Sequence, residues 1–203
     1  AVGRLVLTPD GSGNYFPVQG GGELNGFSKV GNPAPKFQLG WNNSFTYHNL
    51  SLNFLIDGKF GGQVISVMQG MLDYYGVSKV SGQARDQGYV KIRGVDQNGK
   101  DVNQIAPKNW YTFVGGRNAT LGEYVYSATV VRLREVALGY TLPVGGAVKS
   151  LRLSLTGRNL IFFHRTAPYD PELTSSTDNK LGGVDVFNLP TARSFGLKLN
   201  VTF

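Results

Sequence analysis

Residues 37–56 of the chain read FQLGWNNSFTYHNLSLNFLI, a stretch that contains no Asp, Glu, Lys or Arg. A stretch of this length would suffice for a membrane-spanning helix. Polar side chains interrupt it at nearly every second position, however, and hydrocarbon penalises unpaired polar groups by several kcal/mol. The apolar residues instead recur with a period of two, which predicts an extended strand with one apolar face. In the first half that face consists of Phe37, Leu39, Trp41, Phe45 and Tyr47.

The apolar positions change from odd to even numbers after Tyr47. Side chains that flank a two-residue hairpin loop project to the same face, so a turn at His48 and Asn49 would pair Tyr47 with Leu50. Asn also tolerates the positive φ that such a turn requires. The sequence therefore predicts a hairpin of two long strands.

The same alternation recurs in three later segments. Residues 136–142 alternate until Pro143 stops the strand, and a glycine-containing turn leads to alternating residues from 151 onward. The last segment places only apolar side chains on one face, namely Phe195, Leu197, Leu199, Val201 and Phe203. The predicted strands are residues 36–47, 50–62, 127–142, 150–164 and 191–203.

The alternation slips between Val131 and Val136. A β-bulge near Arg134 would explain the slip. Without a bulge, Arg132 and Arg134 would face the same way as Val136, which suits a rim that touches acidic head groups. The sequence alone leaves both arrangements open.

These strands are longer than the about 5 to 6 residues of ordinary soluble strands. Short turns at 48–49 and 143–149 alternate with long excursions at 63–126 and 165–190, the asymmetry of outer-membrane barrels. The expected fold is therefore all-β, with antiparallel strands that form part of a transmembrane β-barrel. Five strands do not close a barrel, since bacterial barrels begin at about 8. The alternative is a soluble carbohydrate-binding β-sandwich, which alternates in the same way.

Composition excludes several other classes of protein. The net charge is +7, but the basic residues are scattered and form no nucleic-acid-binding footprint. The absence of cysteine excludes disulfides and thiolate metal sites. The two histidines, His48 and His164, lie far apart, and no catalytic motif accompanies them. We expect no enzymatic activity, no cofactor and no metal site.

Seven short motifs follow one another along most of the chain: 31–35 (GNPAP), 43–47 (NSFTY), 114–118 (VGGRN), 131–143 (VRLREVALGYTLP), 157–160 (GRNL), 169–172 (YDPE) and 197–203 (LKLNVTF). Their order resembles the C-terminal barrel strands of SusC/RagA-type TonB-dependent outer-membrane transporters. That resemblance implies a barrel of about 22 strands. Residues 1–203 would be the C-terminal portion of this one barrel domain, with 1–35 as an outer loop and the plug domain not present.

The resemblance also implies a function and partners. The protein would be part of an importer of glycans or peptides in the cell outer membrane of a Gram-negative bacterium. Its partners would be a SusD-like surface lipoprotein, TonB through the missing N-terminal part, the barrel-assembly machinery, outer-membrane lipid and the substrate. No nucleic acid is expected among them. The five apolar residues at 195–203 would be the signal that the barrel-assembly machinery reads, because an extended strand can add to an exposed sheet edge.

Aromatic side chains in the long excursions are the candidates for substrate contact, since their rings can stack on sugars or peptide side chains. These candidates are Tyr74, Tyr75, Trp110, Tyr111, Phe113 and Tyr169. Packing inside large loops is the competing explanation for each of them. Helical spacing over 64–75 predicts a short helix. Asp170, Glu172, Asp178 and Asp185 are expected to be solvated loop charges rather than a calcium site, because they lack the spacing of a calcium-binding loop.

Overall fold

The computed structural model describes residues 5–18, 29–116, 120–173 and 181–203. The chain divides into two compact units. We call residues 32–64, 126–183 and 188–203 the sheet unit, and residues 1–31, 65–125 and 184–187 the helical unit. Each unit is described by itself below.

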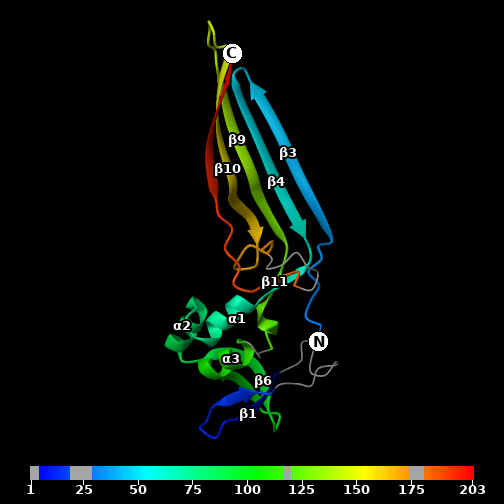
Figure 1. The fold of residues 1–203 in the computed structure, drawn as a ribbon. Coiled ribbons are helices and arrows are strands. Elements are labelled where there is room, and N and C mark those ends of the chain that lie inside the picture. Colours follow the sequence, from blue (N-terminus) through cyan, green and yellow to red (C-terminus); the bar gives the residue numbers. More distant parts are fainter. Residues whose placement is uncertain (1–4, 19–28, 117–119, 174–180) are drawn as a thin grey trace. The chain divides into compact units, whose positions relative to one another are not determined.

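A single antiparallel sheet of five long strands dominates the sheet unit (Figure 1). The strand order is β12-β10-β9-β4-β3. The strands are β3 (Phe37–Tyr47), β4 (Leu50–Phe60), β9 (Val130–Leu142), β10 (Ser150–Arg165) and β12 (Ser194–Thr202). The predicted all-β antiparallel fold is thereby confirmed.

The hairpin of β3 and β4 turns as the sequence predicts. Tyr47 pairs with Leu50, and His48 in the turn adopts a φ of 50°. The register continues in steps of two, so that Phe45 lies opposite Leu52 and Trp41 opposite Ile56. Directly opposed residues in an antiparallel pair project to the same face. The change of apolar phase after Tyr47 therefore keeps all these side chains on one side of the sheet.

A β-bulge interrupts the pairing at Arg134 and decides the question that the sequence left open. On β4, Leu55 lies opposite Glu135 and the next residue, Ile56, lies opposite Leu133, so that Arg134 is skipped. The extra residue restores Leu133 and Val136 to the apolar face and leaves the two arginines on the polar one. The physical reason is the need of each guanidinium for polar partners, which the apolar face lacks.

The sheet unit has a small buried core beyond the end of the long strands. Val64, Ala128 and Ala167 are buried together, and the half-buried rings of Tyr126 and Tyr169 pack against them. The two tyrosine rings contact each other edge to face, with their centroids 6.3 Å apart. Val64 lies on β5 (Gln63–Ser66), which belongs to a small sheet with β8 (Val125–Ser127) and β11 (Val184–Asp185), in the order β11-β5-β8.

The helical unit contains regular structure where the sequence predicted long loops. A four-stranded sheet has the order β2-β1-β6-β7, with β1 (Leu5–Pro9), β2 (Tyr15–Pro17), β6 (Val90–Asp96) and β7 (Asp101–Ile105). Leu7 is fully buried in it. Strands β1 and β6 pair in parallel although residues 10–89 separate them in the sequence. Local alternation carries no sign of such a long-range pairing, which is why residues 1–35 were expected to be an outer loop.

Three helices accompany this sheet: α1 (Val67–Tyr74), α2 (Lys79–Gln87) and α3 (Pro107–Val114), with a short 3-10 helix η1 (Gly122–Tyr124). The hydroxyls of Ser66 and Ser78 cap the first two by accepting hydrogen bonds from Gln69 N and Ser81 N. Helix α1 confirms the helical spacing seen in the sequence. Over the ranges described, no helix is long and apolar enough to cross a membrane.

Candidate functional site

One face of the five-stranded sheet is apolar and exposed. Leu52, Leu138, Leu155 and Leu197 form one row across four neighbouring strands, and the last three are 48%, 55% and 70% exposed. An ordinary soluble sheet would bury such a row against a second layer. A strand of 11 residues spans about 37 Å, or about 26 Å at the tilt of about 45° found in membrane barrels, close to their apolar band of about 25 Å. The face has the dimensions of a lipid-facing surface.

Aromatic side chains lie at the turn end of this face. Tyr47 and Tyr140 both lie opposite Leu50, next to the β3–β4 turn, and both are exposed. Tyrosine rings gather at membrane–water interfaces, where the ring is in the apolar region and the hydroxyl reaches water. Their position is that of an aromatic girdle.

The opposite face of the sheet is polar and internally bonded. Arg152 donates from Nη2 to Ser51 Oγ at 2.6 Å, and this hydroxyl lies 3.3 Å from the carbonyl oxygen of Gly139. A Cβ at Gly139 would lie 2.7 Å from Ser51 Oγ and 2.9 Å from the guanidinium. Only glycine therefore leaves room for this hydrogen-bonded pair.

A buried ion network lies on the same polar face, beside the bulge. Arg132 is 1% exposed and donates from Nη1 to Asp170 Oδ2 at 2.8 Å and from Nε to Asp57 Oδ1 at 3.2 Å. Its Nη2 contacts the Glu172 carboxylate. Arg134 adds bonds of 2.5 Å to Asp57 and 3.0 Å to Glu172. A guanidinium removed from water is stable only when its donors are paired, and Asp170 and Glu172 supply such partners to Arg132. The network therefore ties residues 170–172 to the sheet.

This network corrects the expectation that Asp170 and Glu172 are solvated loop charges. Asp170 is 3% exposed and fully engaged with Arg132. Asp185 is also buried and accepts a hydrogen bond of 2.7 Å from Ser66 Oγ. Asp178 lies outside the described residues. The partners are separated by 38 and 75 positions in the sequence, so spacing alone gives no sign of them. Within the described ranges, no cluster of acidic and histidine side chains is placed to hold a metal ion.

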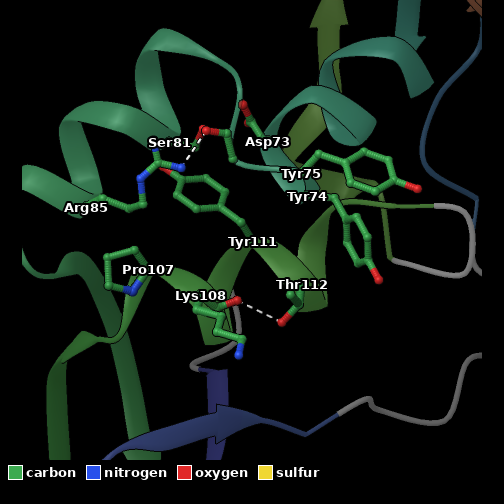
Figure 2. Close-up of a pocket in the computed structure, with 10 residues that line it drawn as sticks. Asp73, Tyr74, Tyr75, Ser81, Arg85, Pro107, Lys108, Tyr111 and Thr112 are labelled. Carbon is green, nitrogen blue, oxygen red and sulfur yellow. Dashed lines mark hydrogen bonds between the residues drawn. The ribbon is translucent and has the colours of Figure 1, made fainter.

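The helical unit contains a pocket of about 240 Å³ formed by α1, α2, α3 and the turn after α1 (Figure 2). Three of the aromatic candidates line it: Tyr74 and Tyr75 from the end of α1, and Tyr111 from α3. Asp73, Arg85 and Lys108 add charged groups to the lining. The pocket therefore combines ring faces with groups of both signs.

Close contacts at glycine bring α1 and α3 together around this pocket. A Cβ at Gly115 would lie 2.4 Å from the carbonyl oxygen of Gly70, so the two backbones approach without room for a side chain. A Cβ at Gly116, which has a φ of 92°, would lie 2.8 Å from the Tyr74 ring. These contacts fix the Tyr74 ring beside the C-terminal end of α3.

The charged groups of the pocket are held by local bonds. Arg85 donates from Nη1 to the carbonyl oxygen of Gly76 at 2.5 Å, which ties α2 to the turn after α1. The buried carboxylate of Asp73 accepts a hydrogen bond of 3.0 Å from Gln69 Nε2. Burial raises the pKa of the Tyr111 phenol, and the nearby Asp73 carboxylate raises it further. The phenol is thus neutral at physiological pH and able to donate a hydrogen bond.

The other three aromatic candidates do not share this pocket. Trp110 is buried on α3, and Phe113 is half-buried one helical turn further along. Tyr169 belongs to the sheet unit, where it packs on the core around Val64. Sequence reasoning missed Asp73, Arg85 and Lys108, because nothing in their local context distinguishes them from ordinary helix-surface charges. Only the packing of the helices brings them together.

Four of the five proposed assembly-signal residues lie on β12, and the fifth, Phe203, follows directly after the end of this strand. Phe195, Leu197, Leu199 and Val201 pair with Gly157, Leu155, Leu153 and Leu151 of β10 and so belong to the apolar face. Strand β12 is an outer strand of the sheet, as is β3, in the part of the chain that the structure describes. An outer strand offers unpaired backbone groups to a further strand.

Sequence comparison finds relatives among TonB-dependent receptors. The chain is 28% identical over 99% of its length to TonB-dependent receptor P3 of Formosa agariphila, and 28% identical over 95% to receptor P26 of the same organism. It spans about a fifth of the length of these curated relatives. No family model matches the chain.

Comparison with solved structures shows the fold. The RagAB peptide importer in its open-open state matches 84% of this chain and 17% of its own, with 17% identity and a TM-score of 0.56. Its closed-closed state matches 95% of this chain and 20% of its own, with 16% identity and the same TM-score. The relatives and structural neighbours are thus receptors and importers rather than enzymes. In sequence and in fold, this chain resembles the C-terminal barrel segment of a SusC/RagA-type TonB-dependent transporter.

Proposed function

We propose that this chain is part of a TonB-dependent outer-membrane importer that takes up glycans or peptides. The observation that carries the proposal is the exposed apolar face of the five-stranded sheet, backed by a polar, hydrogen-bonded face. Lipid outside and water or protein inside is the arrangement that gives a barrel strand these two faces. The similarity to TonB-dependent receptors and to the fold of a peptide importer supports the same function.

The outer strands of the sheet fit this proposal. Hydrocarbon does not tolerate the unpaired backbone groups of an open sheet edge, so β3 and β12 would each pair with a strand of the remaining protein. The resulting barrel would hold about 22 strands. The apolar residues of β12 would also serve as the signal for barrel assembly, because an extended strand at the edge of a sheet can add to a further strand.

The buried ion network gives the polar face a structural role rather than a catalytic one. Every charged group in it is paired with an opposite charge, which leaves no free acid, base or nucleophile among Arg132, Asp57 and Asp170. Transport would therefore proceed by ligand capture and energised passage, without bond chemistry. TonB would act on the part of the protein outside this chain, and a SusD-like surface lipoprotein would close the barrel over its cargo.

The test is uptake by cells that carry the full-length protein. We expect the protein in the outer-membrane fraction, and we expect labelled oligosaccharide or peptide mixtures to accumulate only when both this protein and TonB are present. Deletion of TonB is the matched control, since it leaves the barrel in place. A full-length protein recovered in the soluble fraction without detergent would contradict the proposal and favour a soluble binding module.

A further inference from the structure

We propose that the pocket between α1, α2 and α3 binds a saccharide that carries a carboxylate, held by Arg85 and Lys108 and stacked on the tyrosine rings (Figure 2). The inference rests on the proposed function, because it assigns the pocket to the cargo of the importer. Its volume of about 240 Å³ falls below the roughly 300 Å³ at which sites for drug-sized ligands begin. The pocket therefore suits one residue of a longer chain.

Two cations, Arg85 and Lys108, line the pocket and can bind a carboxylate. Arg85 uses Nη1 to bond the carbonyl oxygen of Gly76, which orients a guanidinium that has five donors in total. Lys108 comes from the first turn of α3, and its side chain is exposed. Arginine binds carboxylates through two parallel hydrogen bonds, and lysine adds a mobile positive charge. In Figure 2 the Arg85 guanidinium lies beside the Tyr111 ring, and Lys108 lies next to Thr112.

The tyrosine rings provide the stacking surface. Tyr74 and Tyr75 meet edge to face with centroids 5.1 Å apart, and both rings are exposed. Such a pair holds its rings in fixed orientations, which lowers the entropy lost when a ligand stacks on them. The phenol of Tyr111 is neutral and can donate to a ring hydroxyl or to the carboxylate.

The polar groups of the lining favour a saccharide over a peptide. Thr112 is exposed, and its hydroxyl oxygen can accept a hydrogen bond from a saccharide hydroxyl while it donates to the carbonyl oxygen of Lys108. Peptides are usually bound along a sheet edge or in an apolar groove. The residues that line this pocket lie on helices and on turns or loops next to them, so no strand edge is available within the described residues.

The experiment measures binding to the full-length protein in detergent by isothermal titration calorimetry. The probes are trigalacturonate, the neutral trisaccharide maltotriose and the acidic peptide triglutamate. We expect trigalacturonate to bind, and we expect Arg85→Gln and Lys108→Gln each to weaken its binding by about tenfold, the effect of one charge-assisted hydrogen bond. Lys100→Gln removes an exposed charge in the β6–β7 turn and should change nothing. Lys108→Gln keeps the test valid if loss of the bond to Gly76 disturbs the Arg85 variant.

Each alternative result overturns a defined statement. If maltotriose bound as tightly as trigalacturonate, Arg85 and Lys108 would not recognise the carboxylate. If only triglutamate bound, the pocket would be a peptide site. Absence of trigalacturonate binding, or binding unchanged by both substitutions, would overturn the assignment of the pocket. Recovery of the unsubstituted protein from the outer membrane is checked first. Its absence there would contradict the proposed function, whereas an outer-membrane protein that fails to bind contradicts only the inference.

Discussion

The two units of this chain encode their structure in different ways. In the sheet unit, a period of two runs through five strands and decides which side chains face each side. In the helical unit, α1 and α3 meet through glycine contacts such as that between Gly115 and Gly70. The alternation in the sheet unit is local and repeated, so a single substitution disturbs only one row of side chains across the strands. The contacts in the helical unit join residues far apart in the sequence, and each such contact occurs once.

The largest expected effect lies where the sheet unit departs from simple alternation. Arg132→Met leaves the carboxylates of Asp57, Asp170 and Glu172 beside each other without their buried cation. Breaking a buried ion network by removing one partner costs about 3–5 kcal/mol. We expect this loss in the free energy of unfolding of the full-length barrel, measured by urea titration in detergent.

Arg158→Met is the matched control for this change. Arg158 on β10 pairs with Glu135 on β9 at 3.2 Å, and both side chains are exposed. Exposed pairs contribute about 0–1 kcal/mol. If both variants lost the same free energy of unfolding, burial of the network would contribute nothing to the stability of the protein.

A charge on the apolar face should have the next largest effect. Leu138→Arg places a guanidinium within the apolar row, where membrane barrels lose about 2–4 kcal/mol near the bilayer midplane. The comparison variant is Thr156→Arg, on the polar face of the adjacent strand. The measurement is the amount of each variant recovered from the outer membrane. An equal reduction for Leu138→Arg and Thr156→Arg would contradict the assignment of the two faces.

The helical unit should respond most strongly at its closest backbone contact. Gly115→Ala drives a methyl group toward the carbonyl oxygen of Gly70, which should separate α1 from α3 and cost about 1–3 kcal/mol. Gly122→Ala is the control, because no atom lies within 4 Å of the position that its new methyl group would occupy.

Proteolysis of the full-length protein measures this effect, with cleavage of the helical unit expected to accelerate in the first variant only. If neither variant is cleaved faster than the unsubstituted protein, the contact between Gly115 and Gly70 does not hold the two helices together.

The smallest expected effect concerns the β1–β2 turn. The backbone N–H of Ser12, and also that of Asn14, donates to the Asp10 carboxylate and lowers its pKa below the ordinary value for an aspartate. The resulting stability is present above the unfolded pKa and is lost as pH falls through the lowered folded value. The protection of the Ser12 amide from hydrogen exchange, taken relative to the intrinsic exchange rate at each pH, should therefore fall in acid by less than about tenfold, and Asp10→Ala should abolish this dependence.

The sequence predicted the regions whose pattern is local. The register of β3 and β4 follows from the alternation and from the turn at His48, and the slip at Arg134 pointed to the bulge as one of two arrangements. It did not predict that Arg132 binds Asp170, because ion pairing across the fold depends on three-dimensional proximity. Three of the aromatic candidates, Tyr74, Tyr75 and Tyr111, line the pocket, while its charged lining depends on the packing of three helices and was not predicted.

The central claim is that the apolar face of the sheet contacts lipid, and spin labels test it most directly. The chain contains no cysteine, so single cysteines can be placed at residues 153 and 155 on the apolar face and at 154 and 156 on the polar face of β10. In the full-length protein in bilayers, with any cysteine elsewhere replaced, we predict that labels at 153 and 155 collide with oxygen and are shielded from a water-soluble nickel complex. Equal access of the nickel complex to all four positions would contradict the account.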